Sequence, residues 1–279
     1  MTAFRRVLAA PAGVAMRLYR HAHPGKAGLR ILMFHDTRGV RLDALDRLIG
    51  QLAERNLLST PDAAVAFLGG ASIGTTQFLL TFDDGFASNR VAAEQVLRKW
   101  NAQALFFVCP GLIDHPGAEQ AAVIARTIYD GARSAEQVGE NLMDWRDLDR
   151  LVELGHTIGS HTMHHRRLST LDAETREEEV GQAASILKRR FGSADWFAYP
   201  FGDVGSIDPA SLRAVGNQHR FCRAGVRGIN QAGTHPLALR ADSVDLDMPA
   251  GWSDLVLQGA FDWRYCAARA ALDGMIEPG

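Results

Sequence analysis

The most informative part of the chain is Phe78-Leu79-Leu80-Thr81-Phe82-Asp83-Asp84-Gly85. An apolar run of this kind predicts a buried β-strand, and a glycine after it permits a sharp turn. Neighbouring ionised carboxylates repel each other, and they are rarely buried without a partner. Two acids delivered into one turn therefore indicate a functional site, although a solvated strand end would also accommodate them.

A second polar cluster lies at residues 156–165, which hold four of the ten histidines. His161 and His165 are four residues apart, a spacing that places both rings on one face of a helical turn, close enough to share a metal ion. Alone, such a pair is a moderate signal, because short motifs also arise by chance. Two imidazoles and one carboxylate make the ligand set of a catalytic zinc site, which leaves a position for water.

These stretches resemble the motifs of the polysaccharide deacetylases, carbohydrate esterase family 4 or the NodB-homology group. Thr81–Gly85 resembles the family motif T-F-D-D-G, and His161–His165 resembles H-[ST]-x-x-H. Phe197–Gly202 resembles the third motif, R-x-P-Y, in degenerate form. The resemblance spans roughly residues 29–245, which is most of the chain.

The resemblance implies that Asp84, His161 and His165 hold one divalent metal ion, most simply Zn²⁺, with Co²⁺ or Ni²⁺ as alternatives. Asp83 would then be the general base. Its neighbour Asp84 must be bound to the metal, because two unpaired adjacent charges would repel each other. His164 is expected to face away from the metal.

The third motif departs from the family pattern. Ala198 stands where the family has an arginine that orients the base, and Arg240 is the best substitute, with a surface residue on an edge strand as the alternative. Phe201 takes the place of tyrosine, at the position whose backbone N–H helps to bind the oxyanion. With Tyr199 in the same motif, Phe201 is assigned to the oxyanion and substrate contacts.

The general acid is expected to be His35. Leu29–Phe34 predicts a first strand, and Met33-Phe34-His35-Asp36 resembles the motif of a circularly permuted subgroup that includes poly-N-acetylglucosamine deacetylases. In that subgroup the catalytic histidine ends an N-terminal strand, and imidazole titrates near working pH. An ordinary loop histidine is the alternative, and His235 is then the next candidate.

Strands alternate with helices along the chain, which predicts an α/β protein with a parallel sheet. Periodicity alone does not separate a barrel from an open doubly wound sheet. The resemblance implies a single-domain distorted (β/α)7 barrel, over residues 28–279. Residues 114–141 are polar and are expected to form an insertion at the rim, and Glu177–Glu179 a solvated helix face. Residues 237–244 are expected to form the last strand of the sheet.

Composition sets wider limits. The formal charge of −2 gives no electrostatic case for nucleic acid as a partner, and no run approaches the roughly 20 apolar residues of a transmembrane helix. The three widely spaced cysteines favour reduced thiols and a cytoplasmic location. Residues 1–27 are expected to form an amphipathic leader, which could lie on a membrane surface; a secretory signal and export are the alternatives.

The function expected from these features is metal-dependent removal of N-acetyl groups from an N-acetylated sugar, in a polysaccharide or cell-surface glycan. A non-catalytic carbohydrate-binding protein on the same fold is one alternative, and an amidohydrolase acting on a small non-sugar amide is another. A pure binding protein need not retain a base and three metal ligands. The sequence leaves the oligomeric state open.

Overall fold

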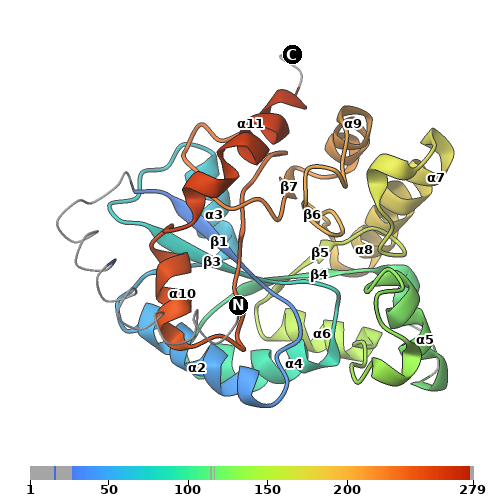
Figure 1. Ribbon diagram of the computed structural model, residues 1–279, viewed down its shortest axis with the longest axis horizontal. Coiled ribbons are helices and arrows are strands. Elements are labelled where there is room, and N and C mark those ends of the chain that lie inside the picture. Colours follow the sequence, from blue (N-terminus) through green and yellow to red (C-terminus); the bar gives the residue numbers. More distant parts are fainter. Residues whose placement is uncertain (1–15, 17–26, 114, 116, 277–279) are drawn as a thin grey trace.

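The computed structural model describes residues 16, 27–113, 115 and 117–276. Its centre is a parallel sheet in the order β7-β6-β5-β4-β3-β1-β8, with β2 added beside β3 (Figure 1). The strands are β1 (Leu29–Phe34), β2 (Leu58–Ser59), β3 (Gln77–Phe82), β4 (Ala104–Val108), β5 (Thr157–Ser160), β6 (Trp196–Ala198), β7 (Phe221–Arg223) and β8 (Asp242–Ser243). Every pairing between these strands is parallel.

Residues 239–243 close the sheet into a distorted barrel. Leu239 forms a parallel bridge with Arg223 of β7, and Asp242 pairs with Leu32 of β1. This segment therefore joins the two ends of the sheet. The expected strand over residues 237–244 is shorter than predicted, since only Asp242–Ser243 is regular strand. The distorted α/β barrel itself is confirmed.

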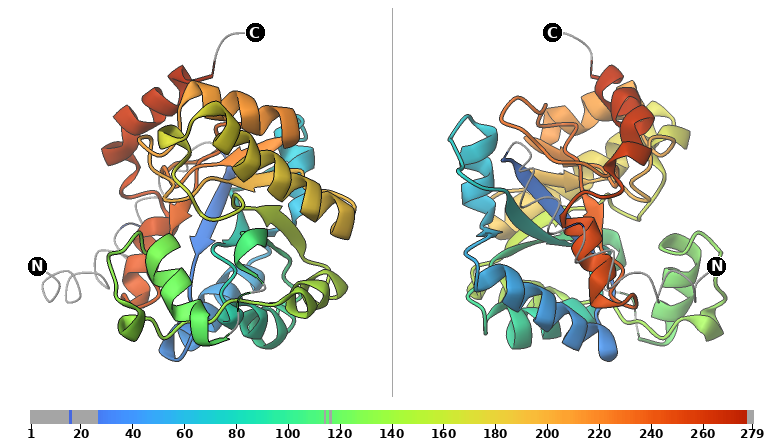
Figure 2. Two further views of the ribbon diagram at one scale, coloured as in Figure 1. Left: turned by 90° about the vertical axis from the view of Figure 1, so that its right-hand side faces the viewer. Right: turned by 60° about the vertical axis from the view of Figure 1, so that its left-hand side comes forward.

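Helices surround the barrel (Figures 1 and 2). They are α2 (Val40–Ala53), α3 (Pro61–Leu68), α4 (Ala87–Ala92), α5 (Gly117–Thr127), α6 (Trp145–Glu153), α7 (Ala173–Glu177), α8 (Ala183–Phe191), α9 (Pro209–Gln218), α10 (Ala250–Leu257) and α11 (Cys266–Gly274). Single π-helical turns, Ala93–Leu97 and Glu178–Gln182, follow α4 and α7. Asp144 caps α6 by accepting from the N–H of Asp147 at 2.8 Å, which satisfies one of the open donors at that helix end.

Alternation along the strands separates two parts of the core. On β3, Leu80 and Phe82 pack with the helices α2 and α6, whereas Leu79 belongs to the cluster between the strands and α3. Side chains two residues apart on a strand share a face. Asp83, just beyond the end of β3, therefore continues the face of Leu79, and on β7 Arg223 continues the face of Phe221.

The segment after β4 has more structure than its polar sequence suggests. It contains α5, whose Val123 and Ile124 pack against Phe86 and Leu142 in a small cluster of their own. Figure 2 shows this green segment at the periphery of the molecule. Its position at the rim agrees with the expected insertion, and α5 brings it close to the metal-ligand candidates.

The expected leader at residues 1–27 lies outside the described residues, apart from positions 16 and 27. Among the residues that the structure describes, every helix is too short or too polar to cross a bilayer.

Candidate active site

Three predicted ligands meet at the carboxyl ends of β3 and β5. Asp84 Oδ1 lies 3.4 Å from His161 Nε2 and 3.3 Å from His165 Nε2. The three ligand atoms all lie within 4.8 Å of one another, and all three side chains are buried. This is the grouping that a single metal ion requires.

Backbone carbonyls set the orientation of both imidazoles. His161 Nδ1 lies 2.7 Å from the carbonyl oxygen of Ala198, and His165 Nδ1 lies 3.0 Å from that of Thr127. A carbonyl can only accept, so Nδ1 carries the hydrogen in each ring and Nε2 keeps its lone pair. Metal-binding histidines are typically held in this way. Two such nitrogens and a carboxylate oxygen fit a divalent metal such as zinc.

Asp84 is suited to bind a cation. Burial alone would raise the pKa of Asp84, but hydrogen bonds that His161 and His165 donate from Nε2 when their rings are protonated outweigh this effect and hold the pKa well below its ordinary value. The carboxyl is therefore ionised at neutral pH. A buried carboxylate beside two neutral imidazoles is a favourable place for a metal ion.

The backbone around the site is unusual. Asp84 has φ 71°, His165 has φ 58° and Phe201 has φ 66°, in the left-handed region that side chains other than glycine rarely adopt. Gly85 continues the turn with φ 74°. Such conformations cost free energy and concentrate at functional sites. Here they aim two ligand candidates at one point.

Asp83 does not join the three ligands; it pairs with a buried arginine. Arg223 Nη2 lies 2.6 Å from Asp83 Oδ1 and 2.5 Å from Oδ2, and both side chains are almost completely buried. The expectation that Arg240 takes this position is wrong. Arg240 instead binds Asp273 at 2.5 and 2.6 Å, on the other side of its strand segment.

The sequence carries only a partial signal for Arg223. It lies within Phe221-Cys222-Arg223-Ala224, an apolar stretch whose first three residues form β7. A charge on the apolar face of a strand needs a partner when it is buried. The signal was present, but the partner is 140 residues away.

The third motif shows one further correction. Tyr199 is buried and donates its hydroxyl hydrogen to the carbonyl of Gly202 at 3.0 Å, so the hydroxyl is engaged within its own turn rather than directed at a substrate. Burial also raises the pKa of Tyr199. Phe201 does lie at the site, with its ring centroid 5.0 Å from that of His165. The turn is packed tightly, because Gly202 and Gly225 lie backbone against backbone.

His35 reaches the same edge of the barrel. β1 and β3 are parallel and Phe34 pairs with Phe82, so His35 and Asp83 follow at equivalent positions of neighbouring strands. His35 is exposed and lines a hollow together with Asp84. The predicted juxtaposition of the two strand ends is therefore present, and the role of His35 as an acid stays a prediction.

The predicted solvated face at Glu177–Glu179 is wrong for Glu179. This side chain is buried and accepts from the backbone N–H of His164 at 2.8 Å and from its Nδ1 at 2.9 Å. Burial would raise the pKa of Glu179, but the hydrogen bonds with His164 outweigh it and lower the pKa. Glu179 thus holds His164 out of the ligand set, in the orientation expected for that histidine.

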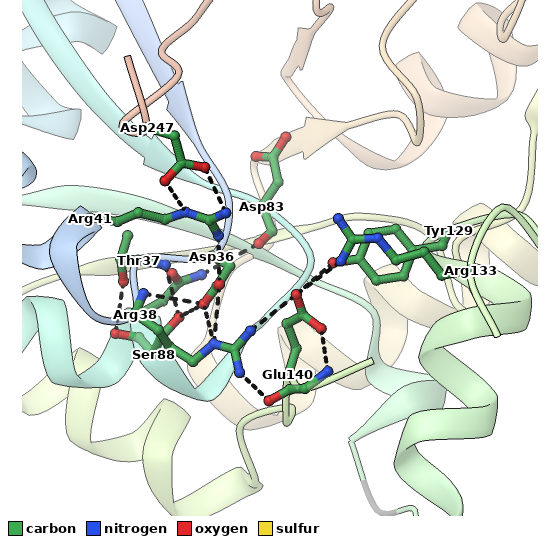
Figure 3. Close-up of polar contacts among 12 residues, drawn as sticks. Asp36, Thr37, Arg38, Arg41, Asp83, Ser88, Tyr129, Arg133, Glu140 and Asp247 are labelled. Carbon is green, nitrogen blue, oxygen red and sulfur yellow. Dashed lines mark hydrogen bonds and ion pairs between the residues drawn. The ribbon is translucent and has the colours of Figure 1, made fainter. Parts of the chain in front are cut away.

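The hollow beside His35, called here the acidic cleft, has a volume of about 350 Å³. A network of ion pairs forms its wall (Figure 3). Arg41 binds Asp36 at 2.7 Å, and Glu140 accepts from the hydroxyl of Tyr129 at 2.9 Å. Arg38 pairs with both Asp36 and Glu140. Because Glu140 belongs to the rim segment and Asp36 follows β1, the network joins these two parts of the chain beside Asp84.

Comparisons with known proteins agree with this geometry. The sequence model of the polysaccharide deacetylase family matches residues 74–219. Comparison with curated proteins gave no match.

Solved structures share the fold at low sequence identity. IcaB from Ammonifex degensii is 20% identical, with a TM-score of 0.63 over 84% of this chain and 97% of that chain. The Streptococcus pyogenes deacetylase PplD is 16% identical, with a TM-score of 0.65 over 84% and 99%. The BpsB deacetylase domain from Bordetella bronchiseptica is 17% identical, with a TM-score of 0.63 over 80% and 98%. Since the family match covers more than half of the sequence, the chain belongs to the polysaccharide deacetylase family, carbohydrate esterase family 4.

Proposed function

We propose that the chain is a metal-dependent hydrolase that removes N-acetyl groups from an N-acetylated sugar, in a polysaccharide or cell-surface glycan. The observation that carries this proposal is the buried group Asp84, His161 and His165 beside the Asp83–Arg223 pair. Hydrolysis of an amide requires an activated water, stabilisation of the oxyanion and a proton for the leaving amine.

Asp84, His161 and His165 would hold the metal ion, for which Zn²⁺ is the first choice and Co²⁺ or Ni²⁺ are alternatives. When bound, such an ion lowers the pKa of a coordinated water to about 7 and polarises a carbonyl group. The carbonyls of Ala198 and Thr127 fix the two rings for this task.

Asp83 is assigned as the general base that accepts a proton from the attacking water. Arg223 is a positioning residue, because it contacts both oxygens of Asp83 and compensates its charge in a buried setting. In the family an arginine of the third motif orients the base. Here Arg223 of β7 would take that role from a different place in the sequence.

His35 is assigned as the general acid that protonates the leaving amine. Its position after β1, on the same edge as Asp83, supports this role, as does its place in the lining of the acidic cleft. The backbone N–H of Phe201 is assigned to the oxyanion. The contact between the Phe201 ring and His165 supports this role, because it brings the residue next to a metal-ligand candidate. This N-terminal placement of the acid supports the permuted, poly-N-acetylglucosamine type of enzyme, with a catalytic domain over residues 28–279.

The test is release of acetate from N-acetylglucosamine oligomers with added Zn²⁺, Co²⁺ or Ni²⁺. Activity should require the metal and disappear in Asp83→Asn, which retains the metal, and in Asp84→Asn, which loses it. Asp43→Asn, at an exposed position of α2, is the matched control.

Two results would replace the proposal. Sugar binding without acetate release under every metal would favour the non-catalytic carbohydrate-binding protein. Acetate release from small amides alone would favour the amidohydrolase.

A further inference from the structure

A second hollow, distinct from the acidic cleft, opens beside the ligand group. This arginine groove has a volume of about 760 Å³, and His165 and Phe201 form part of its wall. Arg126 enters from the last turn of α5, and Arg166 and Arg167 enter from the loop after β5. The ligand group thus borders both hollows, since Asp84 lines one and His165 lines the other.

The lining of the arginine groove carries more positive than negative charge. Its lining holds three arginines and one carboxylate, Asp130. Arg167 pairs with Asp203 at 3.3 Å. Arg126 and Arg166 are exposed. The charge of Arg166 acts on the carboxylates of Glu179 and Asp172, but neither arginine forms a direct hydrogen bond or ion pair through its side chain with any residue that the structure describes.

The acidic cleft shows the opposite arrangement. There Arg41 binds Asp36 at 2.7 Å and Asp247 at 2.8 Å, and Arg133 lies 3.3 Å from Glu140 (Figure 3). These arginines are already neutralised by carboxylates and hold the wall of the cleft together. Of the two hollows, the arginine groove is therefore the one lined by arginines, Arg126 and Arg166, whose side chains form no direct ion pair among the described residues.

The arginine groove is in contact with the reacting centre. The guanidinium carbon of Arg167 lies 4.2 Å from the ring centroid of Phe201, and that ring packs against His165. A group bound beside Arg167 is therefore close to a sugar bound at the ligand group. Planar guanidinium groups match carboxylate and phosphate oxygens, and a concave wall of one sign focuses the field on such a ligand.

We propose that the arginine groove binds an anionic group, a carboxylate or a phosphate ester, on a sugar unit next to the one that loses its acetyl group. The preferred substrate is then an acidic glycan. This inference rests on the proposed deacetylase function and adds the chemical class of its substrate.

The test compares three N-acetylated oligosaccharides of equal length. One is a neutral N-acetylglucosamine oligomer, one alternates N-acetylglucosamine with glucuronate, and one carries phosphate esters on N-acetylglucosamine. Affinity is measured by calorimetry at low and high salt, and acetate release is measured separately. The protein variants are R126Q/R166Q and, as a control with the same change in net charge, R55Q/R98Q at exposed positions away from both hollows.

The wild type should bind at least one acidic oligosaccharide more tightly than the neutral one, and high salt should reduce this preference. R126Q/R166Q should weaken binding of the acidic ligand about tenfold and leave the neutral ligand unchanged, as expected for exposed charge contacts. Whichever acidic ligand loses affinity identifies carboxylate or phosphate as the group.

The inference is overturned if the wild type binds no acidic oligosaccharide better than the neutral one. It is also overturned if R126Q/R166Q loses no more affinity than R55Q/R98Q. If the preference depends on Arg126 and Arg166 but no oligosaccharide releases acetate, the deacetylase function fails while the groove assignment stands.

Discussion

Replacement of Arg223 by methionine tests the arrangement of the proposed base. Methionine is unbranched and fills irregular space, so the change removes the guanidinium while keeping an apolar stem on β7. In the native structure Arg223 is 1% exposed and contacts both oxygens of Asp83, which is 3% exposed. The substitution therefore leaves one buried carboxylate without its charge partner.

The expected cost in stability is large. Breaking a buried ion pair by removing one partner typically costs about 3–5 kcal/mol in the free energy of unfolding, because the remaining charge stays uncompensated. The guanidinium of Arg223 also lies 5.0 Å from the ring of Phe107, so some packing is lost as well. Turnover should fall by about 10²- to 10⁴-fold, the usual contribution of a positioned acid–base group.

The assay combines urea unfolding with acetate release. Arg240→Met is the matched control, since Arg240 pairs with Asp273, whose side chain is half exposed, and such a pair is worth about 0–1 kcal/mol. The double variant Arg223→Met/Asp83→Asn also removes the unpaired charge of Asp83. We expect it to recover part of the lost free energy of unfolding but no activity.

Two results would refute this reasoning. Arg223→Met could unfold at the same urea concentration as the wild type, with normal turnover. Alternatively, Arg240→Met could lose as much activity as Arg223→Met, which would restore Arg240 as the partner of the base.

Three further predictions follow from other parts of the site and core. His161→Ala and His165→Ala should each lose the one divalent metal per chain expected of the wild type, and unchanged metal content by elemental analysis in both variants would end the ligand assignment. His35→Ala should keep metal and fold but slow acetate release by about 10²- to 10⁴-fold, and near-normal turnover would rule out His35 as the acid. Burial lowers the pKa of His156 to about 4. Between about pH 6.5 and pH 4, His156 is therefore protonated in the unfolded chain but stays neutral in the folded protein. The free energy of unfolding should fall over this range by up to about 1.4 kcal/mol per pH unit as the pH is lowered. In His156→Gln the pH dependence of urea unfolding between pH 7 and 5 should be shallower than in the wild type, and identical slopes would contradict this assignment.

Short local motifs, together with their resemblance to those of the family, were enough to predict the ligand group. Asp84 ends a strand with a distinct apolar run, and His161 and His165 lie in one short motif, so their proximity needed only the parallel sheet. The placement of His35 near Asp83 was expected from the resemblance to the permuted subgroup, and the parallel pairing of β1 with β3 agrees with it.

Other parts of the site depend on contacts that have no local pattern. Choosing Arg223 over Arg240 required knowing which strand face points into the barrel and how residues 239–243 close it. The carbonyl of Thr127 is a backbone group, so no residue type marks it in the sequence. Glu179 belongs to an acidic run that is typical of a solvated helix, and only its contact with His164 shows that it is buried.

The bond between Thr127 and His165 has a consequence for how the rim segment behaves. Thr127 ends α5, where carbonyl groups lack partners within the helix, and one of them receives the hydrogen of His165. Order in α5 and the orientation of His165 are thus energetically linked. Linkage is reciprocal. An ion that fixes the orientation of His165 should therefore also stabilise α5, and a glycan that stabilises α5 should increase the affinity for the ion.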